Sequence, residues 1–221
     1  MPNDHNDLHV LYCDNHVISV VKPAGVLSQG DHTGDPSILD HCKHWIKHQY
    51  NKPGNVFLGL VHRLDRPVSG VMVFGRTSKG ASRLSESFRT RTVEKIYLAL
   101  VHGQLTEPAT LRGEMDGKAC ALHYAPLQQP EAVTLLMVRP ETGRKHQIRR
   151  QLSGIGHPIV GDVKYGAPKK MTERRIGLHA HRITVPHPTT REPLILTAPR
   201  PDYLPASRWP QIDTWPIHNP R

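Results

Sequence analysis

Residues 56–75 read VFLGLVHRLDRPVSGVMVFG, which is two apolar runs on either side of a polar segment. The apolar runs, Val56 to Val61 and Val71 to Phe74, predict two buried strands. The polar segment, residues 62–70, therefore predicts a loop that leaves the core and returns to it. A loop held by rigid strands on both sides can present a reactive side chain in a constant position.

The segments before this loop predict two strands and a helix. The strands run from Leu8 to Tyr12 and from Val17 to Lys22, and the second ends in the turn Lys22-Pro23-Ala24-Gly25. The helix has Asp35 as its expected N-cap and Pro36 at its first position. Apolar side chains follow at helical spacing, namely Ile38, Leu39, Cys42, Trp45 and Ile46. We expect this apolar face to dock on a sheet.

The segments after the loop continue this mixture of strands and helices. Ser78 is the expected N-cap of a second amphipathic helix. The run from Val93 to Val101 is apolar on both faces, which predicts a central strand. Asp116-Gly117 is a hairpin signal between two weaker strands, and Ala132 to Val138 predicts a further strand.

The remaining segments predict one short helix and a strand pair. The helix covers about His146 to Ser153 and ends at Gly154, which is expected to take the left-handed conformation. The strands Ile176 to Pro186 and Leu194 to Ala198 pair across a turn. Many strands and few helices, without regular alternation, predict an α+β fold with a mixed, largely antiparallel β-sheet and flanking helices.

Three parts of the chain are expected. Residues 1–8 form a disordered or extended N-terminus, and residues 9–199 form a single domain. Residues 200–221 form a Pro-rich tail, because six prolines among the last 23 residues are too many for regular structure.

Composition narrows the classes of function. The chain has 221 residues, a formal net charge of +10 and three cysteines at unrelated spacings. This cysteine pattern excludes a secreted disulfide framework and favours the reducing cytoplasm, and no stretch is apolar for long enough to span a membrane. Ten basic and two acidic side chains lie between Arg144 and Arg182. Such a basic run favours nucleic acid as the partner, or is simply a solvated surface.

Asp65 is the one carboxylate in the polar loop. Arg63 and Arg66 flank it, and close pairing with them would favour its ionised form. An ionised carboxylate serves as a nucleophile or a base. The alternative from these residues alone is that Asp65 only caps a turn.

The loop with its surroundings resembles the RluA-type pseudouridine synthases. Residues 62–70, HRLDRPVSG, are similar to that family's catalytic motif, which is His-Arg-Leu-Asp, two variable residues and Thr-Ser-Gly. Here Val68 replaces the threonine, so any hydrogen bond from that hydroxyl is missing. Similar companion motifs follow the family's order, at Val20–Gly25, Glu94–Gly103, Thr142–Arg149, Gly156–Gly166 and Leu178–Ala180. The resemblance covers roughly Val17 to Pro199.

The resemblance implies an enzyme that isomerises uridine in rRNA or tRNA to pseudouridine without a metal or a cofactor. It implies that Asp65 is the nucleophile, and attack on the ribose, attack on the base and assisted elimination all stay open for it. It also implies that Arg149 pairs with Asp65, and that Tyr97 stacks on the base and accepts or relays a proton. It also implies that Arg63 takes the place of the flipped base in the RNA. RNA contacts are expected from the basic residues of the two motifs, namely Arg63, Arg66, Arg144, Lys145 and His146.

Two other functions remain open from the residues. His179 and His181 share one strand face, and with His157 and Asp162 they would suit a metal-dependent hydrolase. The same scaffold would also suit a non-catalytic RNA-binding or ribosome-assembly protein. We expect the protein to be a monomer.

Overall fold

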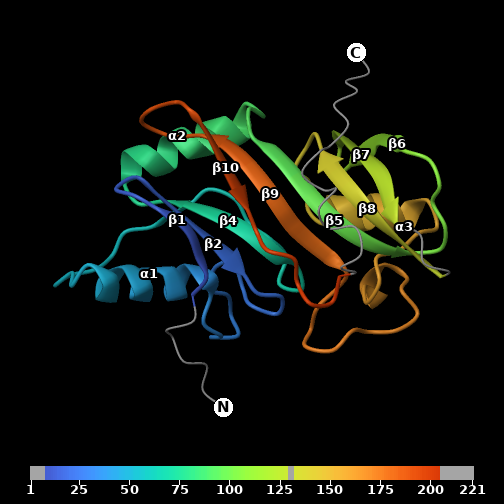
Figure 1. The fold of residues 1–221 in the computed structure, drawn as a ribbon, viewed down its shortest axis with the longest axis horizontal. Coiled ribbons are helices and arrows are strands. Elements are labelled where there is room, and N and C mark those ends of the chain that lie inside the picture. The colour runs from blue at the N-terminus through green and yellow to red at the C-terminus, as the bar shows by residue number, and fades with distance from the viewer. Residues whose placement is uncertain (1–7, 129–131, 205–221) are drawn as a thin grey trace.

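A ten-stranded mixed sheet runs through the described part of the protein (Figure 1). The structure is a computed structural model, and it describes residues 8–128 and 132–204. The strands are β1 Val10–Cys13, β2 Val17–Lys22, β3 Gly59–Leu60, β4 Ser69–Gly75, β5 Glu94–His102, β6 Ala109–Met115, β7 Lys118–Gln128, β8 Val133–Pro140, β9 Leu178–Pro186 and β10 Pro193–Thr197. The helices are α1 Ile38–Gln49, α2 Ser78–Arg89, α3 Gln147–Gly154 and the 3-10 turn η1 Val163–Tyr165.

The strand order is β1-β2-β4-β9-β5-β8-β7-β6, with β10 beside β9 and β3 beside β4. All strand pairs are antiparallel except β4 with β9, which is parallel at Ser69 and His179 and at Gly70 and Ala180. The predicted α+β class with a mixed, largely antiparallel sheet is therefore confirmed. The prediction of a central strand near Val93 to Val101 is also confirmed, because β5 lies between β9 and β8.

The β4–β9 contact joins the two halves of the sheet and depends on a glycine. Gly70 has φ +124°, and a Cβ at this position would lie 2.2 Å from the carbonyl oxygen of Ala180. Only glycine allows the two backbones to approach this closely. The polar loop that begins at residue 62 is therefore attached directly to the middle of the sheet.

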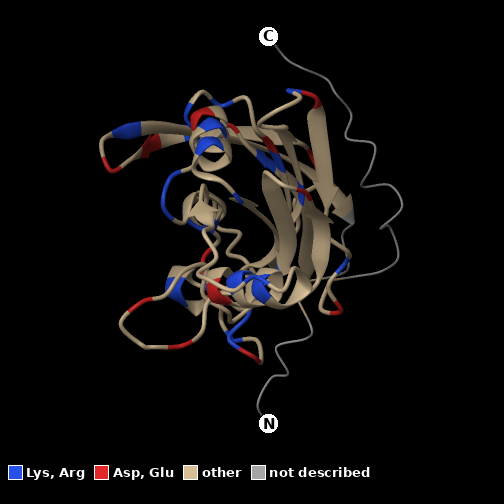
Figure 2. Cartoon of the chain, turned by 90° about the vertical axis from the view of Figure 1, so that its left-hand side faces the viewer, with Lys and Arg blue, Asp and Glu red and all other residues tan. Residues whose placement is uncertain are grey.

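The helices cover one face of the sheet, and Figure 2 shows them on the same side. The main core lies between the sheet and these helices and contains Ile38 and Ile46 of α1, Leu84 of α2 and Leu152 of α3. Most of the Lys and Arg positions in Figure 2 also lie on the helices and loops of this side. Asp and Glu positions also lie on this side in Figure 2, so the charge of the site has to be read from its own residues.

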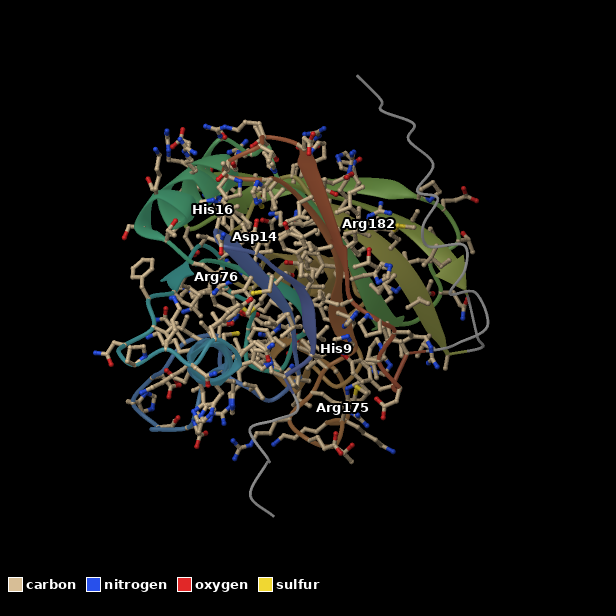
Figure 3. All side chains as sticks on the ribbon, turned by 60° about the vertical axis from the view of Figure 1, so that its left-hand side comes forward. His9, Asp14, His16, Arg76, Arg175 and Arg182 are labelled. Atoms are coloured by element: carbon tan, nitrogen blue, oxygen red, sulfur yellow. The ribbon has the colours of Figure 1, made fainter. Side chains whose placement is uncertain are left out.

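A turn between β1 and β2 is tied to the end of β4. Asp14 accepts hydrogen bonds from the backbone N–H groups of His16 and Val17, at 2.8 and 2.7 Å. The backbone N–H of Arg76 donates to the carbonyl of His16 at 2.8 Å, and its guanidinium donates to the carbonyl of Asp14. Figure 3 shows Asp14, His16 and Arg76 grouped at this end of the sheet. The predicted strand-turn-strand at the start of the chain is confirmed.

The strand predicted over Val56 to Val61 is wrong for most of its length. Only Gly59 and Leu60 pair with β4, and the side chain of Phe57 is half exposed. The reason is the register, which places Gly59 opposite Gly75, the last residue of β4, so that Val56 to Leu58 extend beyond the end of that strand. Apolar character alone does not supply a partner strand.

Both predicted N-caps are wrong. The N-cap of α1 is Ser37 rather than Asp35, because Ser37 and Asp40 exchange hydrogen bonds in a capping box. The N-cap of α2 is Thr77 rather than Ser78, and its hydroxyl accepts the N–H of Gly80 at 3.0 Å. These errors of one or two residues reflect how many Ser, Thr and Asp side chains lie near each helix start.

The predicted end of the third helix is also wrong. Gly154 is the last residue of α3, and the left-handed glycine is Gly156, with φ +83°. The predicted hairpin at Asp116-Gly117 and the strand pair after residue 176 are confirmed as β6–β7 and β9–β10.

The first residues of the predicted tail pack on the sheet. The side chain of Leu204 is buried beside Ile96 and Met137, on the face opposite the helices. The hydroxyl of Tyr203 is hydrogen-bonded to Ser69 at 2.5 Å. The rest of the predicted tail, residues 205–221, and residues 1–7 of the predicted N-terminus lie outside the described residues. Within the described ranges, every helix is too short or too polar to cross a bilayer.

The positions of the helix caps lead to a stability prediction. Thr77→Ala removes the hydroxyl that accepts the N–H of Gly80, and we expect it to lower the free energy of unfolding by about 1 kcal/mol. Ser78→Ala, at the first helical position, should change it by much less. Urea unfolding of the two variants measures the difference. Equal losses, or a larger loss for Ser78→Ala, would contradict the observed cap.

Candidate active site

Hydrogen bonds hold the backbone of the loop that carries Asp65. Leu64 is buried, and Ser28 both accepts its backbone N–H at 3.0 Å and donates to its carbonyl at 2.6 Å. The N–H of Val68 donates to the carbonyl of Asp65 at 3.0 Å, which closes a tight turn. The backbone on both sides of Asp65 is therefore held, while about 29% of its side chain is exposed.

Lys22 supports the same loop from within the protein. Its ammonium donates to the carbonyls of Pro23 and Val26 at 2.8 Å and to that of Arg66 at 3.2 Å. The side chain is fully buried, and burial lowers the pKa of Lys22 to about 7, although the nearby Asp65 carboxylate opposes this shift. Three carbonyls satisfy the ammonium where water cannot reach it. Lys22 thus ties the turn after β2 to the polar loop.

Arg66 makes structural contacts and does not pair with Asp65. Its guanidinium forms an ion pair with Asp35 and donates to the carbonyl of Gly25 at 2.9 Å. Arg63 is exposed at the rim of the loop. The expectation that Arg63 and Arg66 supply the cations beside Asp65 is therefore wrong. The sequence places both next to Asp65, but their side chains leave the loop in other directions.

Arg149 of α3 supplies that cation instead. Its guanidinium donates to Asp65 at 2.9 Å and makes two hydrogen bonds to Asp162, at 2.6 and 2.8 Å. Burial opposes the charge of Arg149, but the hydrogen bonds to Asp162 and Asp65 outweigh burial and raise the pKa of the guanidinium above its usual value. The predicted pairing of Arg149 with Asp65 agrees with this geometry.

Asp162 holds Arg149 in place and was not predicted to do so. It is buried, and it lies in the turn before η1. The sequence contained a signal for it, because a carboxylate between apolar segments needs a cationic partner. The sequence did not show which of the many basic residues that partner is.

His146 approaches Asp65 from the start of α3. Its Nδ1 is hydrogen-bonded to the hydroxyl of Tyr165 at 2.7 Å, and its Nε2 lies 3.6 Å from Asp65. Burial lowers the pKa of His146, with Asp65 opposing and Arg149 adding to the shift, so the imidazole is neutral at pH 7. The backbone of His146 is left-handed, with φ 55°, which is uncommon for a residue other than glycine and occurs often at functional sites.

Tyr97 lines the same space from β5. Its neighbours Ile96 and Leu98 pack in the small core on the opposite face, so Tyr97 points toward the helices and Asp65. Burial raises the pKa of Tyr97 well above its usual value, and the Asp65 charge adds to the shift. Its hydroxyl is therefore protonated at neutral pH.

These side chains surround a cleft of about 870 Å³. This volume suits a ligand of nucleotide size. The cleft is basic, because its lining includes seven Lys and Arg side chains, namely Arg63, Arg89, Arg91, Lys95, Arg144, Lys145 and Arg149, but only the two carboxylates Asp65 and Glu141.

Seven of the eight predicted site residues line this cleft, namely Arg63, Asp65, Tyr97, Arg144, Lys145, His146 and Arg149. Arg66 is the exception. Four residues that hold or complete the site had no predicted role in it, namely Lys22, Lys95, Asp162 and Tyr165. The sequence placed Lys22 in a turn, Asp162 in a possible metal site and Tyr165 in a companion motif.

The side chains proposed for a metal site make other contacts. His179 is hydrogen-bonded to Ser69 at 2.7 Å, and His157 donates to the carbonyl of His102 at 2.8 Å. Asp162 accepts two hydrogen bonds from Arg149. Among the described residues, no group of three or more His, Cys, Asp or Glu side chains is arranged to hold a metal ion.

Comparison with known sequences places the chain among RNA-modifying enzymes. A family model described as RNA pseudouridylate synthase matches residues 16–154. The chain is 33% identical to tRNA pseudouridine synthase C of Haemophilus ducreyi over 229 residues, which covers 87% of this chain and 90% of that protein. It is 34% identical to ribosomal large subunit pseudouridine synthase D of Xanthomonas campestris over 225 residues, which covers 89% of this chain and 67% of that protein.

A solved structure agrees with these sequence matches. The structure titled human RNA Pseudouridylate Synthase Domain Containing 4 superposes with a TM-score of 0.73 at 26% sequence identity, covering 88% of this chain and 89% of that chain. The similarity of fold thus extends over most of the chain.

The burial of Lys22 leads to a prediction about pH. With a pKa near 7 in the folded state and 10.5 in the unfolded state, Lys22 binds more protons when the chain is unfolded, so its contribution to stability rises with pH between these values. We expect the free energy of unfolding of the wild type, relative to Lys22→Met, to increase by roughly 1 kcal/mol per pH unit in this interval. Urea unfolding across the pH range measures it.

Lys79→Met is the matched control, because Lys79 is an exposed lysine on α2. The difference in the free energy of unfolding between the wild type and Lys79→Met should not rise with pH in this interval. A constant difference between the wild type and Lys22→Met would show that Lys22 keeps its ordinary pKa.

Proposed function

The chain belongs to the RNA pseudouridylate synthase family, as its resemblance to the RluA-type enzymes predicted, and we propose on this premise that it isomerises specific uridines in structured RNA to pseudouridine. One observation carries this proposal. A carboxylate, Asp65, lies on a fixed loop within a basic cleft and is held by Arg149 at 2.9 Å. The related sequences named above act on tRNA and on ribosomal RNA, and these are the two substrate classes we propose.

The reaction needs no atom that uridine does not contain. The bond between C1′ of ribose and N1 of uracil breaks, a bond between C1′ and C5 forms, a proton leaves C5, and N1 gains a proton. The protein must extrude the nucleotide from its stack, supply a nucleophile and hold the free base while it turns. We therefore propose that no cofactor takes part.

Asp65 is the nucleophile in this proposal. Its carboxylate is partly exposed toward the cleft, and the guanidinium of Arg149 holds it in one orientation. The neutral imidazole of His146 lies on its other side. An ionised carboxylate with a fixed position can act as soon as the sugar reaches it, without reorganisation of the site.

We propose that Tyr97 stacks on the base and donates a hydrogen bond. Its raised pKa keeps the phenol protonated at neutral pH, so it is better suited to donate a proton than to accept one. The hypothesis that Tyr97 accepts a proton would require the phenolate, which burial and Asp65 disfavour.

The basic rim is the proposed contact surface for RNA. Arg63 is exposed beside the loop, where a side chain can enter the space that an extruded base leaves. Arg144, Lys145 and His146 also line the cleft. A role for Arg66 in RNA binding remains a prediction, and its pairing with Asp35 favours a structural role.

We propose that the protein acts in the cytoplasm as a monomer without a bound metal. Cys13, Cys42 and Cys120 are all free thiols, which suits a reducing compartment. The contacts made by His157, His179 and Asp162 favour a structural role for these side chains over metal ligation.

The test of this function is the loss of one charge. Asp65→Asn removes the nucleophile but keeps the size of the side chain, and we expect no tritium release above background from RNA that carries 5-tritiated uridine. The RNA comes from cells that lack the gene, so that the target uridines are unmodified. Folding and RNA binding should persist, because Asp162 still holds Arg149.

Asp116→Asn is the matched control, because Asp116 is exposed and pairs with Arg150 at the tip of the β6–β7 hairpin. It should retain full activity. Residual turnover in Asp65→Asn would remove Asp65 from its catalytic role. A wild-type protein that binds RNA without releasing tritium would instead be the non-catalytic RNA-binding protein.

The metal-dependent hydrolase makes a separate prediction. Tritium release by the wild type should be the same with and without a chelator such as EDTA, because each step of the proposal uses side chains of this chain only. RNA cleavage that EDTA abolishes would favour the hydrolase. Gel analysis of the RNA after each reaction distinguishes the two results.

A further inference from the structure

Lys95 is a cation in the cleft to which the catalytic proposal assigns no role. It lies on β5, two residues before Tyr97, and points to the same face of the sheet. The side chain is half-buried, and no described carboxylate lies within ion-pair distance of its ammonium. Burial lowers the pKa of Lys95, and the charge of Arg91 adds to the shift. The folded protein thus holds an ammonium whose charge is not compensated.

The neighbours of Lys95 do not supply the missing negative charge. His62 is close enough for the Lys95 charge to act on it, but burial lowers the pKa of His62 to about 3, so the ring is neutral. The Nε2 atom of His62 accepts the N–H of Val73 at 3.0 Å, and the ring stacks on Phe88. His62 is therefore part of a fixed wall and cannot turn to accept a hydrogen bond from Lys95.

The other side of Lys95 is open toward the loop after β8. A Cβ built on Gly143 would lie 3.9 Å from the ammonium nitrogen. Lys95 therefore reaches across from the sheet to the segment that carries Arg144 and Lys145. Cations from two distant parts of the chain meet at this end of the cleft.

Arg91 extends the same positive region to the surface. It lies in the turn between α2 and β5 with a left-handed backbone, φ 60°, and it is exposed. Both carboxylates of the cleft are engaged elsewhere, since Asp65 pairs with Arg149 and Glu141 pairs with His123 at 2.5 Å. The charges of Lys95 and Arg91 therefore remain available to an anion from outside.

We propose that Lys95 and Arg91 form a phosphate-binding subsite for the RNA strand next to the target nucleotide. The inference rests on the proposed function and adds the path of the backbone, which passes between the α2–β5 turn and the loop that carries Arg144. A phosphate supplies the negative charge that Lys95 lacks, and a half-buried ammonium interacts with it more strongly than an exposed one. Contacts of this kind fix the position of the strand while the base enters the cleft.

The test measures the number of phosphate contacts through their salt dependence. The full chain binds a fluorescein-labelled decauridylate, and fluorescence anisotropy gives the association constant at several KCl concentrations. For single strands, each contact contributes about 0.7 to the slope of log K against log of the salt concentration. We expect Lys95→Gln to reduce the magnitude of this slope by about 0.7 and to weaken binding at low salt roughly tenfold.

Two further variants separate a specific contact from a general effect of charge. Lys95→Arg keeps the cation and should keep the slope of the wild type. Lys79→Gln removes one exposed lysine of α2 outside the cleft and should leave the slope unchanged. An unchanged slope in Lys95→Gln, an equal reduction in Lys79→Gln, or no binding of decauridylate by the wild type would each overturn the proposal.

The salt dependence of decauridylate binding does not depend on catalysis. The proposed activity and the proposed phosphate subsite can therefore fail separately. A wild type that releases no tritium, combined with a reduced slope in Lys95→Gln, would reject the enzyme and keep the phosphate subsite. An active wild type with an unchanged slope in Lys95→Gln would keep the enzyme and reject the subsite.

Discussion

The contact between Arg149 and two carboxylates is the constraint on which the site depends. Asp162 fixes the guanidinium with two hydrogen bonds, and the remaining nitrogen reaches Asp65. Arg149 and Asp162 need each other, because a buried charge without its partner typically costs about 3 to 5 kcal/mol. The network joins the polar loop, α3 and the turn before η1, which are separated by many residues in the chain. The orientation of Asp65 is thus a property of the whole fold.

The sheet makes this network possible by bringing its two halves together. The parallel contact between β4 and β9 lies directly after the polar loop, and Gly70 permits it by lacking a side chain. Ser69 adds hydrogen bonds to His179 and to Tyr203, so β9 and the segment after β10 both hold the start of β4. Lys22 holds the same loop from the side of β2. The loop and the start of β4 are therefore anchored by three different parts of the chain.

The cleft is electropositive because its Lys and Arg side chains outnumber its carboxylates. The two carboxylates of the cleft are paired, whereas several cations at the rim have no carboxylate beside them within residues 8–128 and 132–204. A polyanion that enters such a cleft replaces unfavourable contacts between like charges with favourable ones. Burial disfavours the charged form of the titratable groups at the centre. It keeps the rings of His146 and His62 neutral and the hydroxyl of Tyr97 protonated. Asp65 therefore faces neutral donors and one fixed cation.

The sequence alone determined what depends on neighbours along the chain. The apolar runs predicted β2 and β5, and the turn signal Asp116-Gly117 predicted the β6–β7 hairpin. The order of the motifs predicted the family and the pairing of Asp65 with Arg149. Only the tertiary structure decided which residues cap the helices, that Val56 to Leu58 lack a partner strand, and that Arg66 turns away from Asp65. It also decided that Asp162 holds Arg149 and that Lys95 has no carboxylate partner among the residues that the structure describes. The reason is that periodicity is a local property, whereas an ion pair or an unpaired charge is defined by the distance between side chains that folding brings together.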